Sequence, residues 1–107
     1  MVKEQDKKVI YQTIQKYIEI LHENRIPIWQ IYLFGSHTKG TQHADSDIDP
    51  AIFLDKEEIN GFDENLRLMK LRWDVDLTIE PHCFARTDLD DPDPFVMEII
   101  QTGERIV

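Results

Sequence analysis

The spacing between a Gly-Ser pair and a pair of aspartates constrains this chain most. Gly35-Ser36 follows an apolar run, and ten residues separate it from Asp47-Ile48-Asp49. Two carboxylates one residue apart on a strand point to the same face of a sheet. A Gly-Ser turn that opens into a helix offers backbone amides to a phosphate group. The pattern therefore predicts two strands joined across a phosphate-binding turn, with paired acids beside it.

Apolar periodicity predicts the elements around this pattern. Apolar residues recur on one helical face between Val9 and Asn24, which indicates an amphipathic helix. The β-rich run from Ile28 to Phe34 predicts a buried strand. Residues 36–39 are expected to form a short helix that stops at Gly40, and residues 47–54 a second strand.

The second half of the chain predicts a third strand between two helices. Asp63 is expected to N-cap a helix that runs to about Arg72. Residues 73–80 alternate between apolar and polar side chains, which indicates a half-buried strand. Asp74 and Asp76 share the polar face of that strand. We prefer Asp76 as the functional acid because it lies deeper in the strand.

The end of the chain predicts a closing helix. Residues 81–92 are expected to be irregular. Asp93 is expected to cap a helix whose first turn holds Pro94 and whose end is marked by Gly103, before a short strand over residues 104–107. Helices alternate with strands, so we expect an α+β fold with a small mixed β-sheet flanked by helices. The length of 107 residues suits one domain over residues 1–107.

Composition limits the classes of partner. The net charge of −9 disfavours direct binding of nucleic acid and suits a basic protein partner. The apolar stretches are too short to span a membrane, and the first residues lack the apolar core of a signal peptide. A lone cysteine, Cys83, fits the reducing cytoplasm.

The three acids predict metal-dependent chemistry. Mg²⁺ prefers oxygen ligands and usually binds through one or two carboxylates together with substrate phosphates. Asp47 and Asp49 would supply those carboxylates, and Asp76 would complete a second ion site from a neighbouring strand. Two ions roughly 3.5–4 Å apart stabilise the attacking and leaving oxygens of an in-line displacement. The acids therefore predict transfer from a metal-bound nucleoside triphosphate, with Asp76 beside the nucleophile.

The residues around the Gly-Ser pair are candidates for binding the phosphates. Gly35 has no β-carbon, so its backbone can approach a phosphate closely. Ser36 offers a hydroxyl and an amide, and a helix that starts there adds about half a positive charge. Lys39 would add a cation, and Gly40 would let the chain turn back toward the acidic strand.

The run from Leu33 to Gly40, continued by Ser46 to Asp49, resembles the signature of the DNA polymerase β-like nucleotidyltransferase superfamily. The small size resembles its minimal nucleotidyltransferase (MNT) branch. The resemblance implies a polymerase β palm-like core and Mg²⁺-dependent transfer of a nucleotide from a triphosphate, with release of pyrophosphate. It matches Gly35 and Ser36, with Lys39, Gly40 and Ser46 nearby, to nucleotide binding. It matches Asp47, Asp49 and Asp76 to the metal-binding acids.

MNT proteins are similar to antitoxins paired with HEPN-type toxins. This resemblance implies an antitoxin that transfers AMP from ATP to a tyrosine of the toxin. A chain without an acceptor-binding domain also needs its acceptor brought by a partner. Two alternatives remain open: a non-catalytic antitoxin that neutralises the toxin by binding, and a small-molecule nucleotidyltransferase.

Two positions depart from the family pattern. Pro50 stands where an aliphatic strand residue is usual, and it is expected to affect the angle of Asp49 because proline is tolerated in strands mainly at edges or bulges. His37 stands where an arginine is common. The four histidines show no metal-ligand spacing and are expected at the surface or in loops: His22, His37, His43 and His82. Three aromatic residues are expected in the core: Trp29, Phe34 and Trp73.

Overall fold

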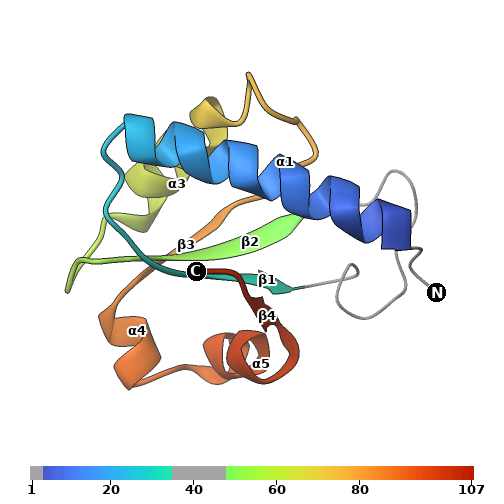
Figure 1. The fold of residues 1–107 in the computed structure, drawn as a ribbon. Helices are drawn as coiled ribbons and strands as arrows, with labels where there is room; N and C mark the ends of the chain where they lie inside the picture. Colours follow the sequence, from blue (N-terminus) through green and yellow to red (C-terminus); the bar gives the residue numbers. More distant parts are fainter. Residues whose placement is uncertain (1–3, 35–47) are drawn as a thin grey trace.

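The computed structural model describes residues 4–34 and 48–107, with side chains from Lys7 onward, and contains a four-stranded sheet with helices on both faces (Figure 1). The strands are β1 (Ile28–Phe34), β2 (Asp49–Leu54), β3 (His82–Ala85) and β4 (Glu104–Arg105). Their order is β3-β2-β1-β4; β1 runs antiparallel to β2 and β4, and β3 runs parallel to β2. The expected mixed sheet of an α+β fold is confirmed.

The helices form two layers around this sheet. They are α1 (Glu4–Glu23), α3 (Gly61–Leu71), α4 (Thr87–Asp90) and α5 (Pro94–Thr102). Figure 1 shows α1 and α3 on one side of the sheet and α4 and α5 on the other. No helix in the described part of the chain is long and apolar enough to cross a membrane.

The core is divided by the sheet into two clusters. The larger one joins the apolar faces of α1 and α3 to the sheet through residues such as Ile14, Leu21, Ile52 and Leu68. The smaller one, under α5, consists of buried Ala51, Phe53, Val96 and Ile99, with half-buried Tyr32, Phe34, Phe84 and Leu89 packed against it. Alternate residues of β2 therefore serve opposite faces of the sheet, as strand geometry requires.

A buried hydrogen bond joins the two helices of the first layer. The Tyr17 hydroxyl of α1 donates to the Leu68 carbonyl of α3 at 2.6 Å. Burial raises the Tyr17 pKa, so the hydroxyl keeps its proton and remains a donor at neutral pH.

We expect Tyr17→Phe to lower the free energy of unfolding by about 0.5–1.5 kcal/mol, the usual net value of one such bond. The ring stays, so only the hydrogen bond is lost. Chemical denaturation of both proteins checks this value. A fall of the same size in Tyr32→Phe, whose half-buried ring contacts Phe53 on the other face, would show that the Leu68 bond is not the cause.

Several expected elements are confirmed. The first helix covers residues 9–23 of the predicted 9–24 segment and begins earlier, at Glu4, and β1 has the predicted bounds. The Asp93 side chain accepts a hydrogen bond from the Val96 amide at 2.8 Å, and Pro94 begins α5. The short strand after Gly103 is present as β4. The predicted helix over residues 36–39 lies outside the described residues.

The expected strand over residues 73–80 is wrong. This segment consists mainly of turns, and Ile79 alone in it forms a bridge, with Ile48. The segment expected to be irregular instead contains β3 and α4. The N-cap of α3 is Asn60 rather than Asp63, because the Asn60 side chain accepts from the Asp63 amide at 3.2 Å.

Pro50 gives a physical reason for the late start of β3. The Ile48 amide donates to the Thr78 carbonyl at 2.9 Å, and the Glu80 amide donates to the Ile48 carbonyl at 2.8 Å. The next donor in this parallel ladder would be the amide of residue 50, which proline lacks. The pairing is therefore interrupted, and β3 begins only at His82. Pro50 itself is fully buried in an inner strand, not at a sheet edge.

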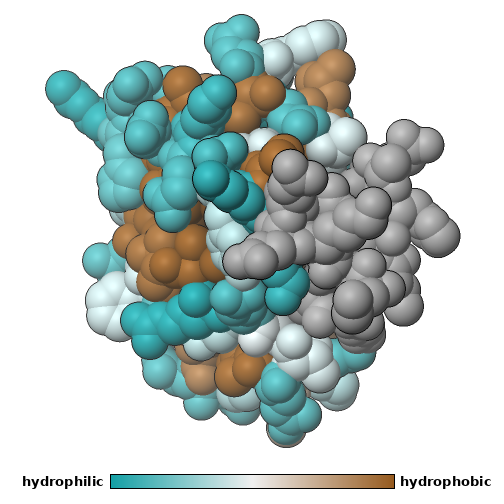
Figure 2. Space-filling model, turned by 45° about the vertical axis from the view of Figure 1, so that its right-hand side comes forward, coloured by the Kyte–Doolittle hydropathy of each residue, from teal (hydrophilic) through white to brown (hydrophobic). Residues whose placement is uncertain are grey.

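Two of the three expected core aromatics lie at the surface. Trp73 is 71% exposed and Trp29 is 45% exposed, whereas Phe34 is half-buried against the cluster under α5. Figure 2 shows one face of the molecule, on which brown hydrophobic groups lie between teal hydrophilic residues. The expectation of a core position is thus wrong for the tryptophans: Trp73 lies in a turn, and the Trp29 ring has the charged guanidinium of Arg86 5.7 Å from its centroid.

Candidate functional site

Asp49 lies at the beginning of β2, paired with Phe34 at the end of β1. It shares a sheet face with Ala51 and Phe53, which pack in the cluster under α5. Its side chain is 23% exposed, so its carboxylate is partly shielded yet accessible. The sheet therefore presents this acid at the point where the chain enters from the predicted phosphate-binding segment.

The hydrogen-bond contact of this acid involves a residue that the sequence did not single out as functional. His82 begins β3, and its Nε2 lies 3.3 Å from Oδ1 of Asp49. The parallel pairing places His82 opposite Ala51, so it stands on the same face as Asp49. Of the expected surface or loop position, the loop part is wrong for His82, which lies in a strand with a partly exposed side chain. No local pattern marked it, because residues 82–85 do not alternate between polar and apolar side chains.

Aromatic rings surround the histidine. The Phe34 ring meets the His82 ring edge-on, with centroids 5.0 Å apart, and the Phe95 centroid of α5 lies 6.4 Å from that of His82. Phe34 and Phe95 also meet edge-on at 5.7 Å, and Phe84 lies 6.1 Å from Phe95. Aromatic side chains from β1, β3 and α5 therefore lie beside the Asp49–His82 pair.

Asp76 lies in a turn rather than on a strand. Its Oδ1 accepts hydrogen bonds from the Thr78 amide at 2.8 Å and from the Thr78 hydroxyl at 2.6 Å. The carbonyl of Thr78 in turn accepts from the Ile48 amide, next to Asp49. The Asp76 side chain is therefore held by Thr78, and the backbone of Thr78 is bonded to Ile48, the residue before β2. Its rival Asp74 is exposed, whereas Asp76 is half-buried.

The remaining predicted site residues lie outside the described residues: Gly35, Ser36, Lys39, Gly40, Ser46 and Asp47. Within residues 4–34 and 48–107 there is no group of three acid, histidine or cysteine side chains that could hold a metal. The half-buried carboxylate of Asp49 is nevertheless an oxygen donor of the kind that Mg²⁺ prefers. The Asp49 carboxylate therefore suits the expected Mg²⁺ as one of several ligands.

Cys83, next to His82, is not a candidate nucleophile. Burial, with a further contribution from the charge of Glu64, raises the pKa of its thiol to about 12. A reactive cysteine needs the thiolate at neutral pH. Cys83 packs instead against the larger core cluster, on the face opposite His82.

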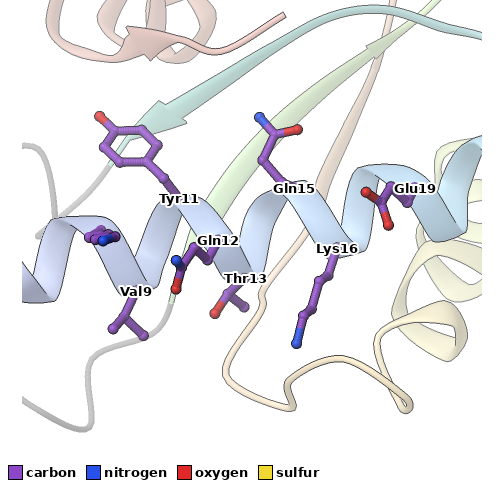
Figure 3. Close-up of a pocket in the computed structure, with 8 residues that line it drawn as sticks. Val9, Tyr11, Gln12, Thr13, Gln15, Lys16 and Glu19 are labelled. Atoms are coloured by element: carbon purple, nitrogen blue, oxygen red, sulfur yellow. The ribbon is translucent and has the colours of Figure 1, made fainter.

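A hollow lies along α1, lined by Lys8, Val9, Tyr11, Gln12, Thr13, Gln15, Lys16 and Glu19. Figure 3 shows that these side chains leave one helix in different directions, with Tyr11 on the side of the strands and Val9 and Lys16 on the opposite side. The Tyr11 hydroxyl donates to the Glu104 carboxylate. Burial and that bond raise the pKa of Tyr11 to about 12. With one carboxylate in its lining, this open groove lacks the paired acids that metal chemistry needs.

Comparison with known proteins places these features in a family context. The family model described as "Polymerase beta, Nucleotidyltransferase" matches residues 15–107. A protein adenylyltransferase, MntA of Shewanella oneidensis MR-1, is 51% identical over 37 residues. That match covers 35% of this chain and 27% of the length of MntA.

Solved structures show the same fold. A toxin–antitoxin crystal structure with AMP-PNP is similar with a TM-score of 0.58 and 28% identity, over 85% of this chain and 69% of that one. A tri-AMPylated Shewanella oneidensis HEPN toxin in complex with its MNT antitoxin gives a TM-score of 0.56 at 21% identity, over 90% of this chain and 70% of that one. The second likeness concerns the fold alone. The expected nucleotidyltransferase core is confirmed.

Proposed function

Because the chain belongs to the Polymerase beta, Nucleotidyltransferase family, we propose that it transfers AMP from ATP to a tyrosine of a HEPN-type toxin and so acts as the antitoxin. The name of MntA and the AMP-PNP in the toxin–antitoxin structure support an adenylyl donor and a protein partner. The observation that carries the proposal is the place of Asp49, the second acid of the Asp-x-Asp pair, at the start of β2.

The proposed reaction assigns a role to each candidate residue. Mg²⁺, when bound, would neutralise phosphate charge and stabilise the attacking and leaving oxygens. The full site would contain two metal ions. Asp47 and Asp49 would bind them, with Asp76 as the third acid. The phosphates would be bound by the residues around the turn: Gly35, Ser36, Lys39, Gly40 and Ser46.

The transfer itself balances as an in-line displacement. The tyrosine oxygen forms a bond to the α-phosphorus of ATP, and the bond from that phosphorus to the bridging oxygen breaks. Pyrophosphate leaves, and the hydroxyl proton passes to Asp76. The second oxygen of Asp76, Oδ2, takes part in neither hydrogen bond to Thr78, so it suits that role.

The partner and compartment follow from charge and cysteine use. The net charge of −9 favours a protein partner with a basic face and disfavours nucleic acid as a direct partner. The single cysteine fits the cytoplasm as the site of action.

The test is the intact mass of the protein that copurifies with this chain, measured after incubation with ATP and Mg²⁺. We expect discrete increments of one AMP each. These increments should be absent when EDTA is present from the start of the incubation. A tyrosine-bearing peptide should carry the label. A tightly bound partner whose mass never changes under these conditions would contradict the proposed transfer.

One observation favours a second candidate, a non-catalytic antitoxin that neutralises its toxin by binding. Asp76 does not lie on the strand beside Asp49, and its Oδ1 is occupied by Thr78. Neutralisation of the toxin by a chain that carries both Asp47→Asn and Asp49→Asn would favour this candidate. Loss of neutralisation in that chain, with the partner still bound, would favour transfer.

A further inference from the structure

The geometry points to a positioning role for His82: its ring holds the carboxylate of Asp49 in the orientation in which that carboxylate binds a divalent cation. The inference rests on the proposed function, because only that function makes Asp49 a metal ligand. It assigns a role to a residue outside the Gly-Ser and three-acid pattern.

The backbone brings the two side chains together. The parallel pairing of β2 and β3 sets His82 opposite Ala51, two residues after Asp49 and on the same face of the sheet. The contact joins Nε2 of His82 to Oδ1 of Asp49 at 3.3 Å. With its proton on Nε2 the ring donates to Oδ1, and Oδ2 stays outside this contact and can face a cation.

Packing fixes the plane of the ring. Phe34 of β1 meets it edge-on, at 5.0 Å between centroids and 62° between planes, and Phe95 of α5 lies at 6.4 Å and 45°. The side chain of His82 is 37% exposed, so these two rings and the strand restrict it from the covered side. A donor that is already oriented loses little freedom when it holds its acceptor, which is what a ligand-positioning residue requires.

The role has a general chemical basis. Carboxylates that bind metals are usually hydrogen-bonded by neighbouring residues, and loss of such a neighbour typically costs about 10- to 100-fold in metal affinity or activity. Among the described residues, the hydrogen-bond contact of the Asp49 side chain is the one to His82. Removal of the donor should therefore weaken metal binding by about 10-fold or more.

The experiment measures Mn²⁺ affinity of the 107-residue chain in the presence of AMP-PNP, by electron paramagnetic resonance of the free ion, so no turnover is needed. His82→Phe keeps a ring against Phe34 and Phe95 but has no N–H, and we expect about 10-fold weaker binding of Mn²⁺. His82→Gln keeps an N–H donor and should recover most of the affinity. His22→Ala, an exposed histidine in the last turn of α1, is the matched control and should bind as the unmodified chain does.

Each other outcome has a distinct meaning. Unchanged affinity in His82→Phe, together with lost affinity in Asp49→Asn, would overturn the positioning role and leave the proposed function standing. Equal losses in His82→Phe and His82→Gln would also overturn it, because the N–H would then not matter. If the unmodified chain and Asp49→Asn bind Mn²⁺ equally, the metal site itself is wrong, and the proposed function fails with it.

Discussion

Asp49→Asn should abolish AMP transfer while the fold stays intact. The substitution keeps the shape of the side chain at the start of β2 but removes the negative charge that a divalent cation needs. Loss of an outer-shell neighbour of a metal ligand typically costs about 10- to 100-fold, so loss of a ligand itself should exceed about 100-fold. The measurement is incorporation of radioactive AMP into the copurified partner at saturating ATP and Mg²⁺.

Two controls make this result specific. Asp90→Asn removes the same charge from an exposed position in α4 and should transfer AMP at the unmodified rate. Circular dichroism should show equal unfolding transitions for both variants, because the Asp49 side chain is only half-buried and, among the described residues, its hydrogen-bond contact is the 3.3 Å one to His82. Full labelling of the partner by the Asp49→Asn variant would contradict a role for Asp49 in the transfer.

Local signals in the sequence were sufficient for elements that need few distant contacts. The apolar face of α1 follows from helical periodicity, and the start of α5 follows from Asp93 and Pro94, whose roles depend on the next three residues only. The sequence also predicted β1 to its bounds, because Gly35 ends a continuous β-rich run. These features are decided within a turn or two of the chain.

The third strand depended on pairing that the sequence does not display locally. Residues 73–80 alternate as a half-buried strand would, yet the partner strand β2 lacks an amide donor at Pro50. The continuous ladder therefore begins at His82, and Trp73 and Leu77 lie exposed in turns. Alternation predicts the faces of a strand once it is paired, but it does not decide whether the pairing is available.

The same long-range pairing explains what was missed at the site. Asp49 was identified because its spacing from Gly35 and from Asp47 is a pattern within the sequence. The proximity of His82 to Asp49 arises only from the register of β2 and β3, across 33 residues of chain. Asp76 remains a proposal for the third acid, and its fixed turn with Thr78 is a structural feature that the alternating pattern did not predict.

Gly103→Ala should destabilise the fold, although it adds only one methyl group. A β-carbon at this position would lie 2.5 Å from the Ile99 carbonyl oxygen and 2.9 Å from that of Leu33, and both are backbone atoms that cannot rotate away. Its φ of −81° is ordinary, so the cost comes from space and not from backbone strain. We expect a loss of about 1–3 kcal/mol in the free energy of unfolding, the range for overpacked sites.

Gly61→Ala is the matched control for this substitution. A β-carbon at Gly61 meets nothing within 4 Å, and the residue begins α3, so alanine should be neutral or stabilising by up to about 1 kcal/mol. Urea denaturation of both variants measures the difference, and equal midpoints would contradict the steric argument.

Gly103 lies against the β1 backbone one residue before Phe34, and α5 carries Phe95 against Phe34 and His82. A shift of α5 away from β1 should therefore also loosen the ring that contacts Asp49, so Mn²⁺ affinity should fall in Gly103→Ala and not in Gly61→Ala.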